Sequence, residues 1–109
     1  MRRGLALLPR RKYDDGVSAP EIEALRVRID EVDQKILELM TERVRLVLAV
    51  GDVKRARQMV VYDPERERRV LDRLASQAAP PLDPMTVRRV FERLIDEMRR
   101  LEQHHVSQH

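Results

Sequence analysis

The segment from Glu21 to Gln58 decides the fold, and it reads EIEALRVRIDEVDQKILELMTERVRLVLAVGDVKRARQ. It contains no proline, and Gly51 is its only glycine. Apolar residues recur along it at alternating spacings of three and four, the pattern of an amphipathic helix with a heptad-like seam. The seam consists of Ile22, Leu25, Ile29, Val32, Ile36, Leu39, Leu46, Val50 and Val53. We therefore predict one long helix from about Ala19 to Gln58.

An arginine interrupts this seam. Between Leu39 and Leu46 the pattern calls for an apolar residue, and the chain has Arg43 there. A guanidinium group on a buried face is costly unless an anion meets it. We predict that Arg43 holds an anion at a position where a core leucine would otherwise lie.

The length of the predicted helix has a consequence for assembly. At about 1.5 Å per residue, residues 21–58 would extend over roughly 57 Å. A compact globule of this chain length has a radius of gyration of only about 13 Å. One protomer cannot bury such a helix along its whole length, so we expect an intertwined helical homodimer with two-fold symmetry.

The rest of the chain predicts two shorter helices and two tails. Ser18 and Pro20 are a start signal for the first helix. Asp63-Pro64 and Asp83-Pro84 start the other two, with Asp as the N-cap and Pro at the first helical position. The expected fold is all-α, a three-helix protomer with one very long N-terminal helix. Residues 1–18 are expected to be a disordered tail, 19–103 the helical domain and 104–109 a flexible tail.

Composition narrows the functional classes. There is no cysteine, which excludes disulfides and thiolate metal sites. The net charge is only +3, and the basic residues are mixed with acids and lack interleaved aromatics, so we do not expect nucleic-acid binding. No stretch approaches the roughly 20 apolar residues of a membrane span. The apolar run from Leu5 to Leu8 is too short for a signal peptide, and we expect a cytoplasmic protein.

Charged residues near the seam are candidates for a ligand site. Lys54 lies three turns after Arg43 on nearly the same face, roughly 16 Å along the axis, so both cations could hold one small dianion. Arg26 lies about 25 Å from Arg43 and is rotated by roughly 100°, so only a second, antiparallel chain could bring it to that site. For Lys54 and Arg26, the simpler alternative is a solvated surface charge.

Four further candidates, Asp63, Arg66, Glu67 and Glu102, lie at the ends of the shorter helices. Arg66 and Glu67 flank the apolar face of the second helix, close to Asp63. Acids at a helix N-terminus also have a purely structural role, and Asp63 has that role as N-cap. Glu102 continues the apolar face of the third helix one turn after Met98; its alternative is a solvated side chain at a frayed end. No serine has a recognisable base partner, and the histidines near the C-terminus are poorly spaced for a metal.

These charged positions resemble one family, the all-helical AroQ-type chorismate mutases, from about Glu21 to Glu102. The matching motifs are Leu25-Arg26-x-x-Ile29-Asp30-x-x-Asp33, Leu39-x-x-x-Arg43, Val50-Gly51-x-x-Lys54 and Val61-Tyr62-Asp63-x-x-Arg66-Glu67. The resemblance implies an intertwined dimer with shared active sites and the rearrangement of chorismate to prephenate, a step toward phenylalanine and tyrosine. This intramolecular reaction needs no nucleophile, metal or cofactor.

The resemblance also assigns roles to individual residues. It implies that Arg43 and the partner subunit's Arg26 bind the two substrate carboxylates, and that Lys54 donates to the ether oxygen. Asp63 and Glu67 would contact the ring-hydroxyl side, with Arg66 nearby. Catalysis would come from holding the reactive conformer and stabilising charge on the breaking C–O bond.

Two positions depart from the usual bacterial pattern of this family. Met98 and Glu102 stand where a serine and a glutamine are common. Met98 cannot donate a hydrogen bond, so one carboxylate contact is expected to be lost. A carboxyl group donates only when protonated, and fungal members also have Glu at the second position. We predict that activity rises toward acidic pH and that Glu102→Gln flattens the profile. The departures are also compatible with a weak catalyst that needs a partner enzyme of the same pathway.

Two other functions remain open at this point. An isochorismate-pyruvate lyase of the same fold uses a similar cationic pocket, although Asp63-x-x-Arg66-Glu67 is more similar to the mutases. A non-catalytic helical dimerisation or regulatory module is the alternative from another class, but such a module has no reason to place Arg43 in a buried seam.

Overall fold

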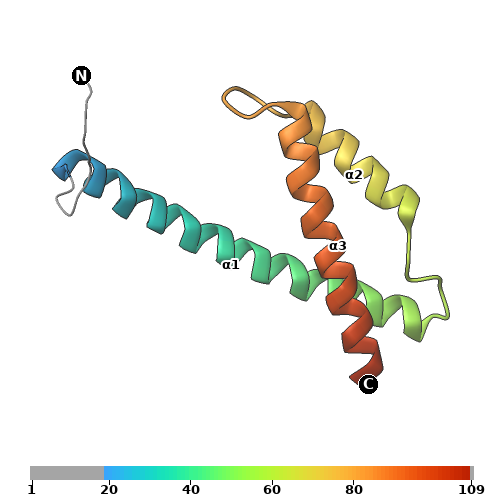
Figure 1. Ribbon diagram of the computed structural model, residues 1–109. Coiled ribbons are helices and arrows are strands. Elements are labelled where there is room, and N and C mark those ends of the chain that lie inside the picture. Colours follow the sequence, from blue (N-terminus) through green and yellow to red (C-terminus); the bar gives the residue numbers. More distant parts are fainter. Residues whose placement is uncertain (1–18, 109) are drawn as a thin grey trace, which may run out of the picture. The chain divides into compact units, whose positions relative to one another are not determined.

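The computed structural model describes residues 19–108, and within them the chain forms three helices and no strand (Figure 1). The helices are α1 (Pro20–Ala56), α2 (Pro64–Ser76) and α3 (Pro84–Gln108). The predicted all-α fold with one very long first helix is confirmed. The predicted disordered tail 1–18, including Ser18, lies outside the described residues, as does His109.

Both Asp-Pro helix starts are confirmed. The carboxylate of Asp63 accepts a hydrogen bond from the backbone N–H of Arg66 at 3.0 Å, and Pro64 follows as the first residue of α2. The carboxylate of Asp83 accepts from both the backbone N–H and the hydroxyl of Thr86, at 2.8 and 2.9 Å. These bonds hold the pKa of Asp83 below its usual value. Each cap satisfies N–H groups that a helix end leaves without an intrahelical partner.

The C-terminus of α1 is closed by a Schellman motif. Gln58 adopts a left-handed conformation, with φ of 58°. The N–H of Met59 then bonds the carbonyl of Lys54 at 2.7 Å, and the N–H of Gln58 bonds the carbonyl of Arg55 at 3.0 Å. This pattern satisfies the last carbonyls of the helix and ends it at Ala56, two residues before the predicted end.

The structure divides into two units, residues 1–40 and 41–109. Every described helical residue of the first unit, from position 20 to 40, is exposed. The second unit contains the buried residues: Gly51 of α1, Val70 and Ala75 of α2, and Ile95 and Met98 of α3.

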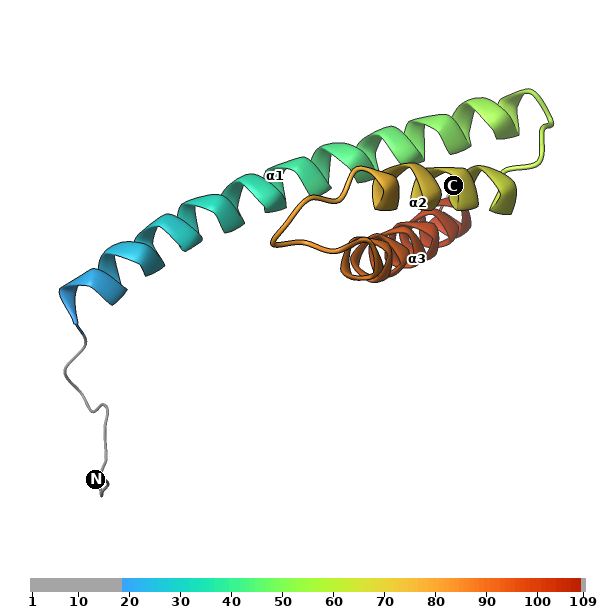
Figure 2. The same cartoon turned by 90° about the horizontal axis from the view of Figure 1, so that it is seen from above.

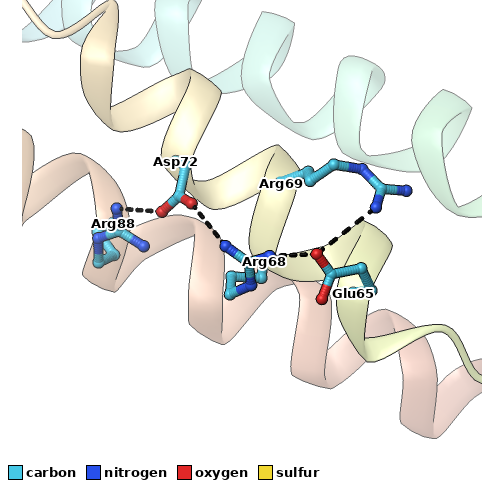
Figure 3. A network of polar contacts seen from close by, with 5 residues as sticks. All are labelled: Glu65, Arg68, Arg69, Asp72 and Arg88. Atoms are coloured by element: carbon cyan, nitrogen blue, oxygen red, sulfur yellow. Dashed lines mark hydrogen bonds and ion pairs between the residues drawn. The ribbon is translucent and has the colours of Figure 1, made fainter.

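Helices α2 and α3 pack against each other within the second unit (Figures 1 and 2). Asp72 of α2 accepts from Arg88 of α3 at 2.8 Å, and the same carboxylate pairs with Arg68 at 3.4 Å. Glu65 extends this chain of ion pairs by contacting Arg68 and Arg69 (Figure 3). Because most of these side chains are exposed, each pair contributes little to stability, and packing of the apolar faces holds the two helices together.

Side chains also connect α3 to the last turns of α1. His105 of α3 lies 3.2 Å from Asp52 of α1, measured from Nε2 to Oδ1. Hydrogen bonding from Arg55, and then from His105, lowers the pKa of Asp52. Helix α3 extends to Gln108, so residues 104–108, which the sequence predicted to belong to a flexible tail, are helical. No helix within residues 19–108 has the length and hydropathy needed to cross a membrane.

Candidate active site

The second unit contains a pocket of about 330 Å³. That volume is in the range of small-molecule sites. Its walls come from the last turns of α1, the connection that follows, the first turns of α2 and the C-terminal half of α3. The lining residues that carry chemistry are Arg43, Lys54, Tyr62, Asp63, Arg66, Glu67, Met98, Arg99 and Glu102.

Three cations line this pocket without a carboxylate partner. Arg43, Lys54 and Arg66 form no ion pair among the residues that the structure describes. By contrast, eight other arginines of α1, α2 and α3 each pair with a nearby acid: Arg26, Arg55, Arg68, Arg69, Arg88, Arg93, Arg99 and Arg100. Some exposed cations outside the pocket, such as Arg45, Arg73 and Arg89, also form no ion pair within residues 19–108. In the pocket, however, three unpaired cations line one concave site, and such a site favours an anionic ligand.

Arg43 is the most constrained of the three cations. Burial lowers the pKa of Arg43, the neighbouring Arg66 lowers it further, and Glu67 acts in the opposite direction. Its Nη1 donates to the sulfur of Met98 at 2.8 Å. A thioether is only a weak acceptor, so this contact orients the guanidinium without neutralising it. Arg43 therefore keeps its charge available to a ligand.

The two acids at the start of α2 are committed to protein partners. Asp63 caps the helix through the N–H of Arg66. Glu67 forms a forked pair with Arg99 of α3, in which Nη2 and Nε of Arg99 donate to the two carboxylate oxygens at 2.5 and 3.2 Å. Arg99 also lies over the ring of Tyr62, 5.1 Å from its centroid.

Glu102 fits into the pocket wall because Gly51 has no side chain. A Cβ placed on Gly51 would collide with the carboxylate oxygen Oε2 of Glu102, and it would lie 3.3 Å from Nη1 of Arg55. That Nη1 is buried and has no hydrogen-bond partner among the described residues. Because Gly51 has no side chain, the carboxylate of Glu102 from α3 can reach the surface of α1, close to the guanidinium group of Arg55.

The pocket brings together seven of the eight residues that the sequence nominated. These are Arg43, Lys54, Asp63, Arg66, Glu67, Met98 and Glu102. Arg26 belongs to the first unit, where its side chain is exposed and pairs with Glu23 at 3.2 Å. Within residues 19–108 no group of His, Asp or Glu side chains is arranged to hold a metal ion.

Two contributors could not be found from the sequence. Arg99 pairs with a residue 32 positions earlier, and no local pattern signals such a contact. Its one sequence signal is the spacing of three from Glu102 and four from Ile95, which places it beside the apolar face of α3. Gly51 stands out as the only glycine of the long helix, but its role depends on the approach of Glu102.

Fold and site together define a class: an all-helical protein whose second unit forms a cation-lined pocket for a small anion. Residues 25–103 match the sequence profile of the family described as chorismate mutase type II. The chain belongs to this family.

Individual relatives agree with this assignment. The chain is 39% identical over 90 residues to a bifunctional chorismate mutase/prephenate dehydratase of Stutzerimonas stutzeri, a match covering 78% of this chain and 25% of that protein. A chorismate mutase of Methanocaldococcus jannaschii is 39% identical over 54 residues, 50% of this chain and 54% of that one. A chorismate mutase structure from Thermus thermophilus superposes with a TM-score of 0.73 at 34% identity, over 76% of this chain and 94% of that one. The chain spans about a quarter of the length of the first curated relatives.

Proposed function

We propose that the protein is a chorismate mutase that converts chorismate to prephenate in the biosynthesis of phenylalanine and tyrosine. The observation that carries the proposal is the set of three cations, Arg43, Lys54 and Arg66, that line one pocket without a carboxylate partner among the described residues. A dicarboxylate is the ligand that such a site favours, and the names of the relatives supply its identity. Residues 19–103 are proposed as the domain that carries the activity.

The proposed mechanism is an intramolecular shift in which one C–O bond breaks as one C–C bond forms. Arg43 binds a substrate carboxylate and Lys54 donates to the ether oxygen, where negative charge develops as the C–O bond breaks. Donors fixed at such a position stabilise the transition state more than the ground state. Asp63 and Glu67 face the ring-hydroxyl side of the substrate, with Arg66 nearby. Holding the substrate in its folded, reactive conformer supplies the rest of the rate enhancement.

We propose that a second copy of the chain completes the site. The seam residues from Ile22 to Leu39 are all exposed, and a continuous apolar face of this size favours association. In a two-fold, antiparallel arrangement, Arg26 of the partner subunit would bind the second substrate carboxylate. The name of the Stutzerimonas relative joins the mutase to a prephenate dehydratase, whose substrate is the product proposed here. An enzyme of that step is the kind of pathway partner we propose.

The test follows loss of chorismate absorbance with purified protein, from acidic to mildly alkaline pH, and identifies the product. Formation of prephenate supports the assignment. Release of pyruvate from isochorismate instead would assign the lyase. No turnover, together with no binding of a transition-state analogue, would leave the non-catalytic module.

The same assay tests the role proposed for Glu102. A carboxylate cannot donate a hydrogen bond to the ether oxygen, whereas a carboxylic acid or an amide can. Activity of the natural protein should therefore rise toward acidic pH, and Glu102→Gln should flatten that profile. An unchanged profile in the variant would refute this role without touching the assignment of the reaction.

A further inference from the structure

Arg99 is the one arginine of the pocket that is already paired. Its Nη2 donates to Glu67 at 2.5 Å and to Asp96 at 3.2 Å, and its Nε donates to the second oxygen of Glu67 at 3.2 Å. These bonds, above all those to Glu67, raise the pKa of Arg99. The flat guanidinium also covers the ring of Tyr62. Three segments therefore meet at Arg99: α3, the first turn of α2 and the connection before it.

These contacts set Arg99 apart from the other cations of the pocket. Its Nε–H and both hydrogens of Nη2 are directed at protein carboxylates, so most of its donors are unavailable to a bound anion. Arg43 and Arg66, in contrast, have no acidic partner among residues 19–108. Arg99 lines the pocket without sharing the function of the other cations.

The partner that Arg99 restrains is the acid best placed to disable the site. Glu67 lines the same pocket as Arg43 and Arg66, and it lies close enough to Arg43 to raise that residue's pKa. A released Glu67 could rotate toward either cation and form an ion pair there. Such an internal pair would compete directly with a carboxylate of the substrate.

We propose that Arg99 is a positioning residue that clamps Glu67 at two points and so keeps Arg43 and Arg66 open for the substrate. The forked geometry matters because it fixes the plane of the carboxylate, which a single bond cannot do. Tyr62 supports the clamp by holding the guanidinium flat. This inference rests on the proposed function, because it presumes a dicarboxylate substrate.

The test is a double-variant cycle measured on chorismate turnover. Arg99→Met should raise KM about tenfold or more, the size expected for the loss of a charge-assisted pair, with a smaller change in kcat. Glu67→Gln removes the charge that would compete for Arg43 and Arg66. Because Glu67 is also proposed to face the ring hydroxyl, the KM of this single variant is the reference for the next step. Adding Arg99→Met to Glu67→Gln should therefore change KM by less than about twofold, because Arg99 acts only through Glu67.

Two further variants separate the clamp from a simple charge effect and from a general disturbance of α3. Arg99→Lys keeps the charge but loses the fork, so it should restore KM only in part. Arg100→Met is the matched control, since Arg100 neighbours Arg99 on α3, pairs with Glu97 at 2.8 Å and does not line the pocket. It should leave KM unchanged. Circular dichroism and melting temperature of every variant report folding independently of activity.

The outcomes distinguish this inference from the proposed function. If the natural protein neither converts chorismate nor binds a transition-state analogue, the proposed function fails and the clamp fails with it. If the natural protein is active, three results overturn the clamp alone: an unchanged KM in Arg99→Met, additive effects in the cycle, or full restoration by lysine. A loss of activity that parallels unfolding in both Arg99 variants would also overturn it, since Arg99 would then be structural.

Discussion

The two parts of α1 carry one apolar seam, but only the second part also has a buried face. From position 20 to 40 every residue is exposed, including Leu25, Ile29 and Leu39. From position 41 to 56 several side chains are half-buried, Gly51 is buried, and Arg43 and Lys54 line a pocket, although Leu46, Val50 and Val53 of the seam are exposed. A heptad-like seam thus predicts that a face is to be covered, and it does not predict which chain covers it. Helix α3 covers a different face of the second part, around Gly51, and for the seam we propose a second copy of the chain.

The largest expected effect comes from placing charge on the seam of the first part. Ile29→Asp together with Ile36→Asp would bury two carboxylates in the proposed dimer interface, at a cost of several kcal/mol each. We expect the dimer to dissociate and the activity to be lost, because the partner subunit's Arg26 would leave the site. Sedimentation velocity and the chorismate assay measure the two effects.

A matched control uses the opposite face of the same turns. Val27→Asp with Gln34→Asp adds the same number of carboxylates two positions before each seam residue. This pair should leave both assembly and turnover intact. Equal effects of the two double variants would show that the seam is no interface.

The next effect tests the second part of the helix. Arg43→Leu completes the apolar seam and removes a cation from the pocket. We expect kcat/KM to fall by about 10²–10³-fold, as for the loss of one preorganised donor. The melting temperature should stay the same or rise, because a partly buried guanidinium without an acidic partner is replaced by an apolar side chain. Arg45→Leu, at an exposed position two residues later, is the control; comparable losses in both would refute a specific role for Arg43.

A smaller effect is expected where the second part of α1 meets α3. Gly51→Ala would place a methyl group against the Glu102 carboxylate and displace it. We expect activity to fall by about tenfold or more, since small displacements in a site are costly. Stability should change little, because the displaced carboxylate is the far end of a flexible side chain and alanine is the better helix former.

Removing the Glu102 carboxylate should leave only the gain in helix propensity from Gly51→Ala. In a Glu102→Ala background no carboxylate lies over Gly51, so Gly51→Ala should then stabilise the protein by up to about 1 kcal/mol. Chemical denaturation measures both differences. An equal gain from Gly51→Ala in the natural background would contradict the packing of Glu102 against this glycine.

Local sequence signals predicted the helices well and the side-chain pairings poorly. The two Asp-Pro caps and the long seam needed only neighbouring residues, and the structure confirms the elements they predicted. The seam also singled out Arg43, because a charge at an apolar position is visible without a fold. The fork between Arg99 and Glu67 and the seating of Glu102 on Gly51 were invisible, since each joins residues tens of positions apart whose meeting depends on how α3 packs. The left-handed end of α1 was missed because Gln58 is not the glycine that usually signals it.

The smallest effect concerns that end of α1. A left-handed conformation costs an L-residue about 1 kcal/mol, and glycine avoids this cost. Part of this gain in stability is offset because glycine also raises the conformational entropy of the unfolded chain. We therefore expect Gln58→Gly to raise the melting temperature slightly and leave turnover unchanged. Gln77→Gly is the matched control, because Gln77 ends α2 with φ of −95°, where glycine relieves nothing and should lower stability. Equal destabilisation of both variants would show that the left-handed conformation of Gln58 carries no cost in free energy. The Schellman hydrogen bonds to Lys54 and Arg55 would then hold Gln58 without strain.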